Sequence, residues 1–146
     1  MHTRILAAVL AALLSACAGR PAVEHVVPQG EWPYPFSPAV RVGNLLFLSG
    51  AIGTLPDRPR ELVPGGIEAE TRQTLENIRA VLERSGSSLA RVVKCTVMLA
   101  DMREWERMNA VYVTFFPGPK PARSALGANG LALGARVEIE CIATVD

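Results

Sequence analysis

Apolar and polar residues follow two different periods along the chain, and the changes of period mark the predicted elements. Apolar residues alternate with polar ones on both sides of the turn dipeptide Gly43-Asn44 and again over residues 91–100. This alternation predicts a hairpin and a half-buried strand. From Ile67 to Ser85 the apolar residues recur at three- and four-residue steps, which predicts a helix that ends at Gly86.

A second helix is predicted to begin near Met102, where Asp101 and Glu104 have the spacing of a capping box. Its apolar residues keep the helical step as far as Pro117, which stops the helix. The segment from Thr54 to Gly66 contains three prolines and is expected to be a loop that closes the first β part.

Two strands with a connection from Gly127 to Gly134 complete the chain. The order strand, strand, helix, strand, helix, strand, strand predicts an α+β protein. We expect a two-layer sandwich with two helices packed on one face of a mixed sheet. With 146 residues, of which 49% are apolar, the chain has enough material for one core, assigned to residues 33–146. Residues 17–32 show little periodicity and are expected to form a tether that contributes a first edge strand.

Among the chargeable residues in the alternating runs near the C-terminus, Arg123 and Glu140 are the candidates for chemistry. If their strands are neighbours on either side of a turn, the two side chains come close together. A guanidinium can bind a substrate carboxylate bidentately, and a carboxylate can orient water. The alternatives are a structural salt bridge for Arg123 and, for Glu140, a solvated pair with Glu138 at a spacing of two.

Several motifs resemble those of the RidA (YjgF/YER057c/UK114) family, in the same order, from about Tyr34 to Ala143. They are Tyr34–Asn44, Leu48-Ser49-Gly50, Met108–Tyr112, Pro121-Ala122-Arg123-Ser124 and Arg136–Ala143. The resemblance implies the chorismate-mutase-like fold of YjgF and a homotrimer with clefts between its subunits. It also implies hydrolytic deamination of reactive 2-imino or enamino acids to 2-oxo acids and ammonia, without a cofactor.

The same resemblance implies roles for individual residues. Arg123 would hold the carboxylate of the 2-imino acid, and Glu140 would position and activate water. Ser49 would line the cleft, although a hydroxyl at a strand end is often a partner of the local backbone. Asn109 and Tyr112 lie three residues apart on one helix face and would support the cleft, although Tyr112 could equally belong to the core.

Three positions depart from the family pattern in the apolar direction. Phe36 stands where many members have tyrosine, Ala51 where glutamine is frequent, and Ala125 where deaminating members carry a cysteine. Phe36 and Ala125 are still expected to line the substrate site. The loss of polar groups favours a second hypothesis as well, a non-catalytic exported trimer of the same fold that binds a ligand or acts like a chaperone.

The N-terminus predicts export. His2 and Arg4 precede an apolar run from Ile5 to Leu14 that is too short to span a membrane, as in a signal peptide. The sequence Leu14-Ser15-Ala16-Cys17 resembles a bacterial lipobox, so residues 1–16 would be removed and Cys17 would carry the lipid anchor. The alternative is an ordinary cleavage site that includes a cysteine. In a diderm host, Ala18 after the cysteine favours the periplasmic face of the outer membrane.

The net charge and the cysteine and histidine residues exclude several further classes of function. A formal net charge of +1 without a basic block gives no sign of nucleic-acid binding. Cys95 and Cys141 fall at inward-facing strand positions as small apolar residues, and export would permit a disulfide between them. His25 is the only histidine after the leader, which argues against a nucleophile activated by histidine. No metal-ligand cluster or phosphate loop is recognisable, so no metal or other cofactor is implied.

Overall fold

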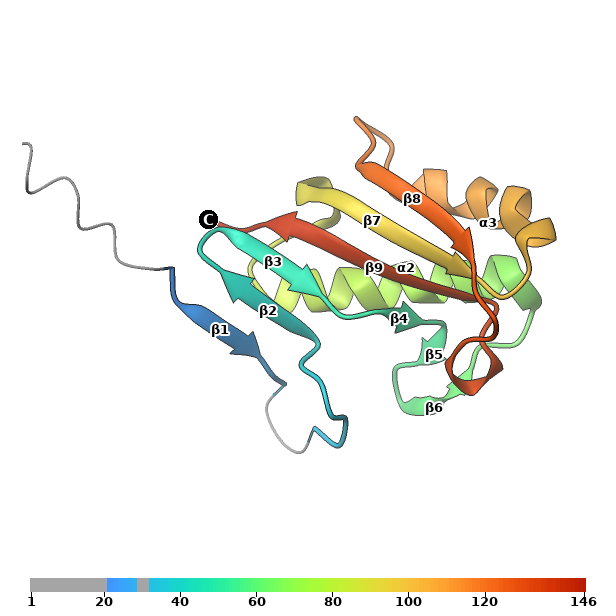
Figure 1. Cartoon of the computed structure of the whole chain (residues 1–146), viewed down its shortest axis with the longest axis horizontal. Helices are drawn as coiled ribbons and strands as arrows, with labels where there is room; N and C mark the ends of the chain where they lie inside the picture. The colour runs from blue at the N-terminus through green and yellow to red at the C-terminus, as the bar shows by residue number, and fades with distance from the viewer. Residues whose placement is uncertain (1–20, 29–31) are drawn as a thin grey trace, which may run out of the picture.

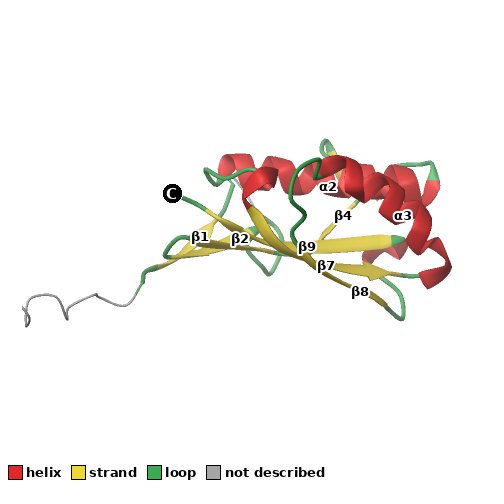
Figure 2. Ribbon diagram, turned by 90° about the horizontal axis from the view of Figure 1, so that it is seen from above, coloured by secondary structure: helices red, strands yellow, loops and turns green. Residues whose placement is uncertain are grey.

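The computed structural model of the protein describes residues 21–28 and 32–146 and forms a two-layer α+β sandwich. Helices α2 (Gly66–Arg84) and α3 (Trp105–Tyr112) cover one face of a mixed seven-stranded sheet, and Figure 2 shows both on the same side. The sheet runs in the order β1-β2-β3-β9-β7-β8, with β4 also paired to β9. Its strands are β1 (Val23–Val26), β2 (Ala39–Val42), β3 (Leu45–Leu48), β4 (Ala51–Ile52), β7 (Val92–Leu99), β8 (Ala122–Gly127) and β9 (Val137–Thr144). The predicted fold class is confirmed.

The core lies between the sheet and the two helices. Alternate residues of the central strands β7 and β9 are buried there, among them Val97, Leu99 and Ile139. The helices face them with apolar side chains at helical spacing, such as Leu75 and Met108, both fully buried. The period-two and helical patterns of the sequence therefore mark the two sides of one core, as predicted.

The hairpin and the first helix follow the prediction. Strands β2 and β3 pair antiparallel around Gly43-Asn44, and Gly43 has a φ of 60°, which a residue without a Cβ adopts at little cost. Helix α2 ends next to Gly86, whose φ is 75°. Strand β1, within the segment predicted as a tether, pairs with β2 as an edge strand.

Two local expectations need correction. The segment expected to be a loop contains a two-stranded hairpin of β5 (Thr54–Leu55) and β6 (Arg58–Leu62), because a strand with only one partner tolerates Pro59. Asp101 does cap the second helical segment, accepting a bond from the Arg103 amide at 2.9 Å. Glu104 does not complete the capping box, since its carboxylate binds the Arg136 guanidinium at 2.7 Å. Single 3₁₀ turns, η2 (Met102–Glu104) and η3 (Val113–Phe115), flank α3.

The last two strands are not neighbours, which contradicts our expectation for Arg123 and Glu140. Strand β8 pairs parallel with β7 at the edge of the sheet, and β9 pairs antiparallel with β7 on its other side (Figure 1). The physical reason is the crossover through α3, since parallel strands need a long connection and a helix supplies it. Strand β7 therefore separates the two strands that carry the candidate residues.

The two strand cysteines form a disulfide. Cys95 of β7 lies directly opposite Cys141 of β9, their Cα atoms are 4.2 Å apart, and the bond is buried under the helices. Of the two possibilities considered for these residues, the structure has the disulfide. The two cysteines also act as small apolar residues, because their disulfide lies in the core.

The predicted leader, residues 1–16, and the lipidation candidate Cys17 lie outside the described residues. Among residues 21–28 and 32–146, none of the helices combines the length and the apolar character that crossing a membrane requires.

Candidate functional site

Arg123 is held by side chains of α3. On β8 it lies in register with Cys95, which places it on the helix-covered side of the sheet. Its Nη1 donates a hydrogen bond of 2.9 Å to Oδ1 of Asn109, and its guanidinium carbon lies 4.6 Å from the centroid of the Tyr112 ring. The Trp105 ring lies 5.6 Å away. A half-buried guanidinium in contact with two aromatic rings and an amide has little freedom to reorient.

The environment of this guanidinium suits a negatively charged ligand. Arginine has five N–H donors, and Asn109 takes up one of them through its oxygen. Burial raises the pKa of the Tyr112 hydroxyl, and the nearby Arg123 charge acts in the opposite direction. Within the described part of the chain, that buried hydroxyl has no hydrogen-bond partner. Remaining donors on Arg123 can bind a carboxylate bidentately.

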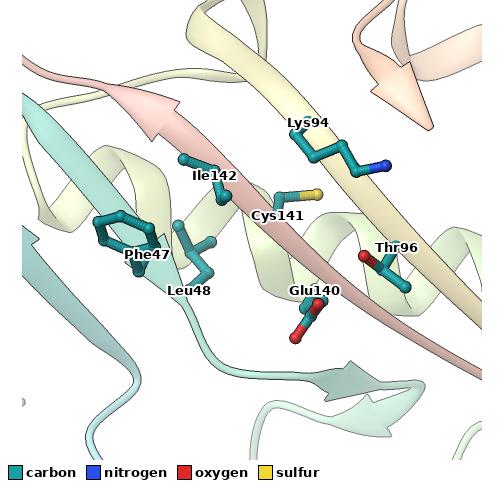
Figure 3. Close-up of a pocket in the computed structure, with 7 residues that line it drawn as sticks. All are labelled: Phe47, Leu48, Lys94, Thr96, Glu140, Cys141 and Ile142. Atoms are coloured by element: carbon teal, nitrogen blue, oxygen red, sulfur yellow. The ribbon is translucent and has the colours of Figure 1, made fainter. Parts of the chain in front are cut away.

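Glu140 lies on the other face of the sheet. On β9 it is in register with Thr96, and its side chain is exposed on the side without helices. It lines a pocket of about 230 Å³, drawn in Figure 3. The pocket residues are Phe47, Leu48, Lys94, Thr96, Glu140, Cys141 and Ile142. In a single chain the sheet itself therefore separates Glu140 from Arg123.

Lys94 and Thr96 were missed by the sequence reasoning. Both lie on β7 and line the Glu140 pocket (Figure 3). Lys94 Nζ donates a hydrogen bond of 2.7 Å to Ser124 Oγ. The alternating pattern of this strand predicts only that these two polar residues lie on its solvent-facing side. Only the register of β7 against β9 reveals that this side faces Glu140.

Glu138 shares the open face with Glu140 and is half-buried. A Cβ atom at Gly50 would lie against the Glu138 carboxylate, so a larger residue at this position would require the Glu138 side chain to shift. Burial raises the pKa of Glu138, and the charge of Glu140 adds to the increase. Glu138 is thus more constrained than the solvated carboxylate considered from the sequence.

Ser49, directly after β3, is hydrogen-bonded to the segment that follows Phe36. Ser49 Oγ donates a hydrogen bond of 2.7 Å to the carbonyl of Ser37, and the Ser49 amide donates to Pro38 at 3.0 Å. The hydroxyl is therefore a partner of the local backbone, while its own acceptor sites are not engaged by this bond. Phe36, next to Ser37, remains 48% exposed.

The two alanines that depart from the family pattern fall on different parts of the sheet. Ala125 is on β8, in register with Val97 and on the same side as Arg123. Ala51 opens β4 and pairs with Ile139. The predicted site residues therefore do not all come together in one chain. Arg123, Asn109, Tyr112 and Ala125 lie at the β8 edge, whereas Glu140 lines the pocket on the open face. Ser49 and Phe36 are not among the residues that line this pocket, and the bond from Ser49 to Ser37 connects the segments that carry them.

A metal site is not apparent in the parts of the chain that the structure describes, 21–28 and 32–146. There, no group of three or more histidine, cysteine, aspartate or glutamate side chains is arranged to hold a metal ion.

Comparisons with known proteins agree with this architecture. The family model described as endoribonuclease L-PSP matches residues 31–145, and the chain belongs to this family, which is the RidA (YjgF) family that its motifs resemble. A crystal structure of the yeast protein YEO7 superimposes with a TM-score of 0.79 at 39% identity, covering 86% of this chain and 100% of that one.

Two similar proteins have names that describe a reaction. The mouse protein named 2-iminobutanoate/2-iminopropanoate deaminase is 43% identical over 109 residues, which cover 75% of this chain and 80% of the mouse protein. The Arabidopsis thaliana protein named Reactive Intermediate Deaminase A, chloroplastic, is 42% identical over 111 residues. That match spans 76% of this chain and 59% of the length of the Arabidopsis protein.

Proposed function

We propose that this protein is a deaminase-like hydrolase that converts reactive 2-imino and enamino acids to 2-oxo acids and ammonia without a cofactor. The observation that carries the proposal is the guanidinium of Arg123, which Asn109 and the Tyr112 ring hold with donors left for a carboxylate. The names of the mouse and Arabidopsis relatives support the same reaction.

In this mechanism Arg123 binds the substrate carboxylate and Glu140 acts on water. The water oxygen bonds to C2 of the imine, the C=N π electrons move to nitrogen, and Glu140 receives the water proton. Returning this proton to nitrogen gives a tetrahedral intermediate that carries one hydroxyl and one NH2 group. Glu140 then takes the hydroxyl proton and passes it to the same nitrogen while the C–N bond breaks, so that ammonia leaves and the 2-oxo acid remains. Ser49 Oγ, which already donates to Ser37, can accept a hydrogen bond from the imine N–H.

We further propose that the site is completed between subunits of a homotrimer. Arg123 and Glu140 lie on opposite faces of one sheet, so a second copy is needed to bring both to one substrate. The sheet face without helices carries Phe47, which is 42% exposed, and Leu45, which is 36% exposed. A neighbouring copy that covers these side chains would remove apolar surface from water.

The reaction is tested by measuring the decay of 2-imino acids that an amino-acid oxidase generates in situ. The full-length protein should accelerate their decay to 2-oxo acid and ammonia. Arg123→Ala and Glu140→Ala should each lower kcat/KM by about a hundredfold or more, as for loss of a charged group in the transition state. Arg103→Ala, which removes an exposed arginine of η2, is the matched control. If the wild type and the variants are all folded but the 2-imino acids decay no faster than they do without protein, the deaminase proposal is wrong.

A second candidate is a ligand-binding or chaperone-like trimer without turnover. Phe36, Ala51 and Ala125 favour it, because each lacks a polar group that the family pattern places there. It predicts carboxylate binding that depends on Arg123, or suppression of aggregation that does not, with no ammonia release in either case. Although the family description names an endoribonuclease, a net charge of +1 does not favour RNA, and we do not propose RNA cleavage.

We also propose that the chain is exported and anchored by a lipid on Cys17, at the periplasmic face of the outer membrane in a diderm host. The Cys95–Cys141 disulfide supports export, since structural disulfides are rare in reducing compartments. In cell fractionation, the wild type should sediment with membranes, and a Cys17→Ser variant should not. Equal membrane association of both chains, or alkylation of Cys95 and Cys141 in intact cells, would argue against this location.

A further inference from the structure

Three aromatic side chains form a cluster in the segment that leads into β2. Trp32, Tyr34 and Phe36 alternate with prolines, and their rings contact one another. The ring centroids of Trp32 and Tyr34 are 4.9 Å apart in an edge arrangement, and those of Tyr34 and Phe36 are 5.5 Å apart and stacked. Trp32 and Phe36 are 6.2 Å apart. All three separations are those of favourable aromatic pairs.

The cluster is held in place by its own backbone and by its neighbours. The Trp32 indole N–H donates to the carbonyl of Phe36, which closes the segment on itself. The Tyr34 hydroxyl faces the carbonyl of Pro59 in β6 at 3.5 Å. Proline at positions 33 and 35 restricts the backbone between the rings. The rings are therefore presented in a defined arrangement.

This cluster adjoins a residue of the proposed site. Phe36 directly precedes Ser37, whose carbonyl accepts the bond from Ser49 Oγ at 2.7 Å. Gly50, the next residue after Ser49, touches the Glu138 carboxylate on the face that also carries Glu140. Phe36 is 48% exposed, so part of its ring is open to a ligand.

We propose that the cluster of Trp32, Tyr34 and Phe36 makes the site selective for 2-imino acids with an aromatic side chain. This inference rests on the proposed function and specifies its substrate class. A substrate ring can stack on the open part of Phe36 while its carboxylate binds Arg123 of the neighbouring copy. Phe36, Ala51 and Ala125, which depart from the family pattern, offer no polar group to a hydrophilic side chain of a substrate. The cluster itself contains no charged side chain.

The test compares kcat/KM of the full-length protein for the imines derived from phenylalanine and from alanine, each generated in situ by an amino-acid oxidase. We expect the aromatic imine to be preferred by about tenfold or more. Phe36→Leu keeps an apolar side chain but removes the ring, and it should lower this preference about threefold to tenfold. Phe36→Tyr should retain it. Val113→Ala, which removes exposed apolar surface from η3, is the matched control and should leave the preference unchanged.

Binding provides a readout that does not depend on turnover. Calorimetric titration with phenylpyruvate and with pyruvate, the corresponding 2-oxo acids, should show tighter binding of phenylpyruvate, and Phe36→Leu should reduce the difference. If phenylpyruvate is preferred but no imine is hydrolysed, the aromatic selectivity stands for a binding site and the deaminase proposal fails. If both imines are hydrolysed with equal kcat/KM, the deaminase stands and the aromatic selectivity is overturned.

One competing role for Phe36 is contact between subunits, because an exposed ring can be covered by a second copy. Native mass measurements of the same variants distinguish the two roles. An assembly that is unchanged in Phe36→Leu supports the ligand role, whereas dissociation of Phe36→Leu under conditions in which Phe36→Tyr stays assembled overturns it.

Discussion

Glu138 is a half-buried carboxyl whose ionisation should make stability depend on pH. Burial raises its pKa in the folded protein above the ordinary 4.5, and the neighbouring Glu140 charge adds to the increase. The folded state therefore binds this proton more tightly than the unfolded chain does. The stabilising contribution is fully present below about pH 4.5 and is lost as the pH rises through the folded-state pKa.

Replacing Glu138 with glutamine removes this ionisation, so the difference in stability between wild type and Glu138→Gln should depend on pH. We expect the wild type to lose free energy of unfolding relative to Glu138→Gln as the pH increases from about 4 to 7.5. Urea unfolding at fixed protein concentration measures the difference. Glu106→Gln, which alters an exposed carboxylate of α3, serves as the control. A difference for Glu138→Gln that does not change with pH would contradict the burial argument.

The positions of individual residues could be predicted from the sequence where the helical or strand period determines which way their side chains face. Asn109 and Tyr112, three residues apart on one helix, were expected to reach a common point, and both contact Arg123. Lys94 and Thr96 could not be found in this way. Their proximity to Glu140 depends on how β7 and β9 are aligned, and a strand's own sequence does not specify its partner's register.

At the scale of elements, the alternation in β7 and β9 was sufficient to predict which residues face the helices. The order of the strands was not predictable from the same pattern. A connection between β8 and β9 that resembles a hairpin turn suggested neighbouring strands, yet the β7-α3-β8 crossover places β8 on the far side of β7. This difference explains why Arg123 and Glu140 were expected to be close together in one chain.

The disulfide links the two strands that contribute most to the sheet's centre. Cys95 and Cys141 are separated by 46 residues in sequence, and a cross-link over a loop of this length typically stabilises a protein by about 2–4 kcal/mol. Because the bond joins β7 to β9, it also holds Thr96 against Glu140 in the proposed pocket. The disulfide thus stabilises the core and also aligns residues of the pocket.

At the scale of the whole molecule, the proposed reaction requires a second copy, because Arg123 and Glu140 lie on opposite faces of one sheet. Each subunit offers Arg123 at the β8 edge and Glu140 on the open face of the sheet. In a closed ring, every interface joins the first surface of one copy to the second surface of the next. One substrate site per interface, with its arginine and its glutamate from different subunits, is the arrangement that this geometry favours.

Mixed assemblies test this arrangement with two variants that are each inactive alone. Arg123→Ala and Glu140→Ala, produced together in one cell, should regain about a quarter of the wild-type rate, because each site draws each residue from an intact subunit about half the time. Arg123→Ala mixed with the double variant Arg123→Ala/Glu140→Ala should stay inactive, since no subunit then supplies the arginine. Native mass spectrometry confirms that the copies have exchanged. If exchanged assemblies of the two single variants have no activity while the wild type hydrolyses imines, the two residues do not act from different subunits, and the proposed site between subunits is wrong.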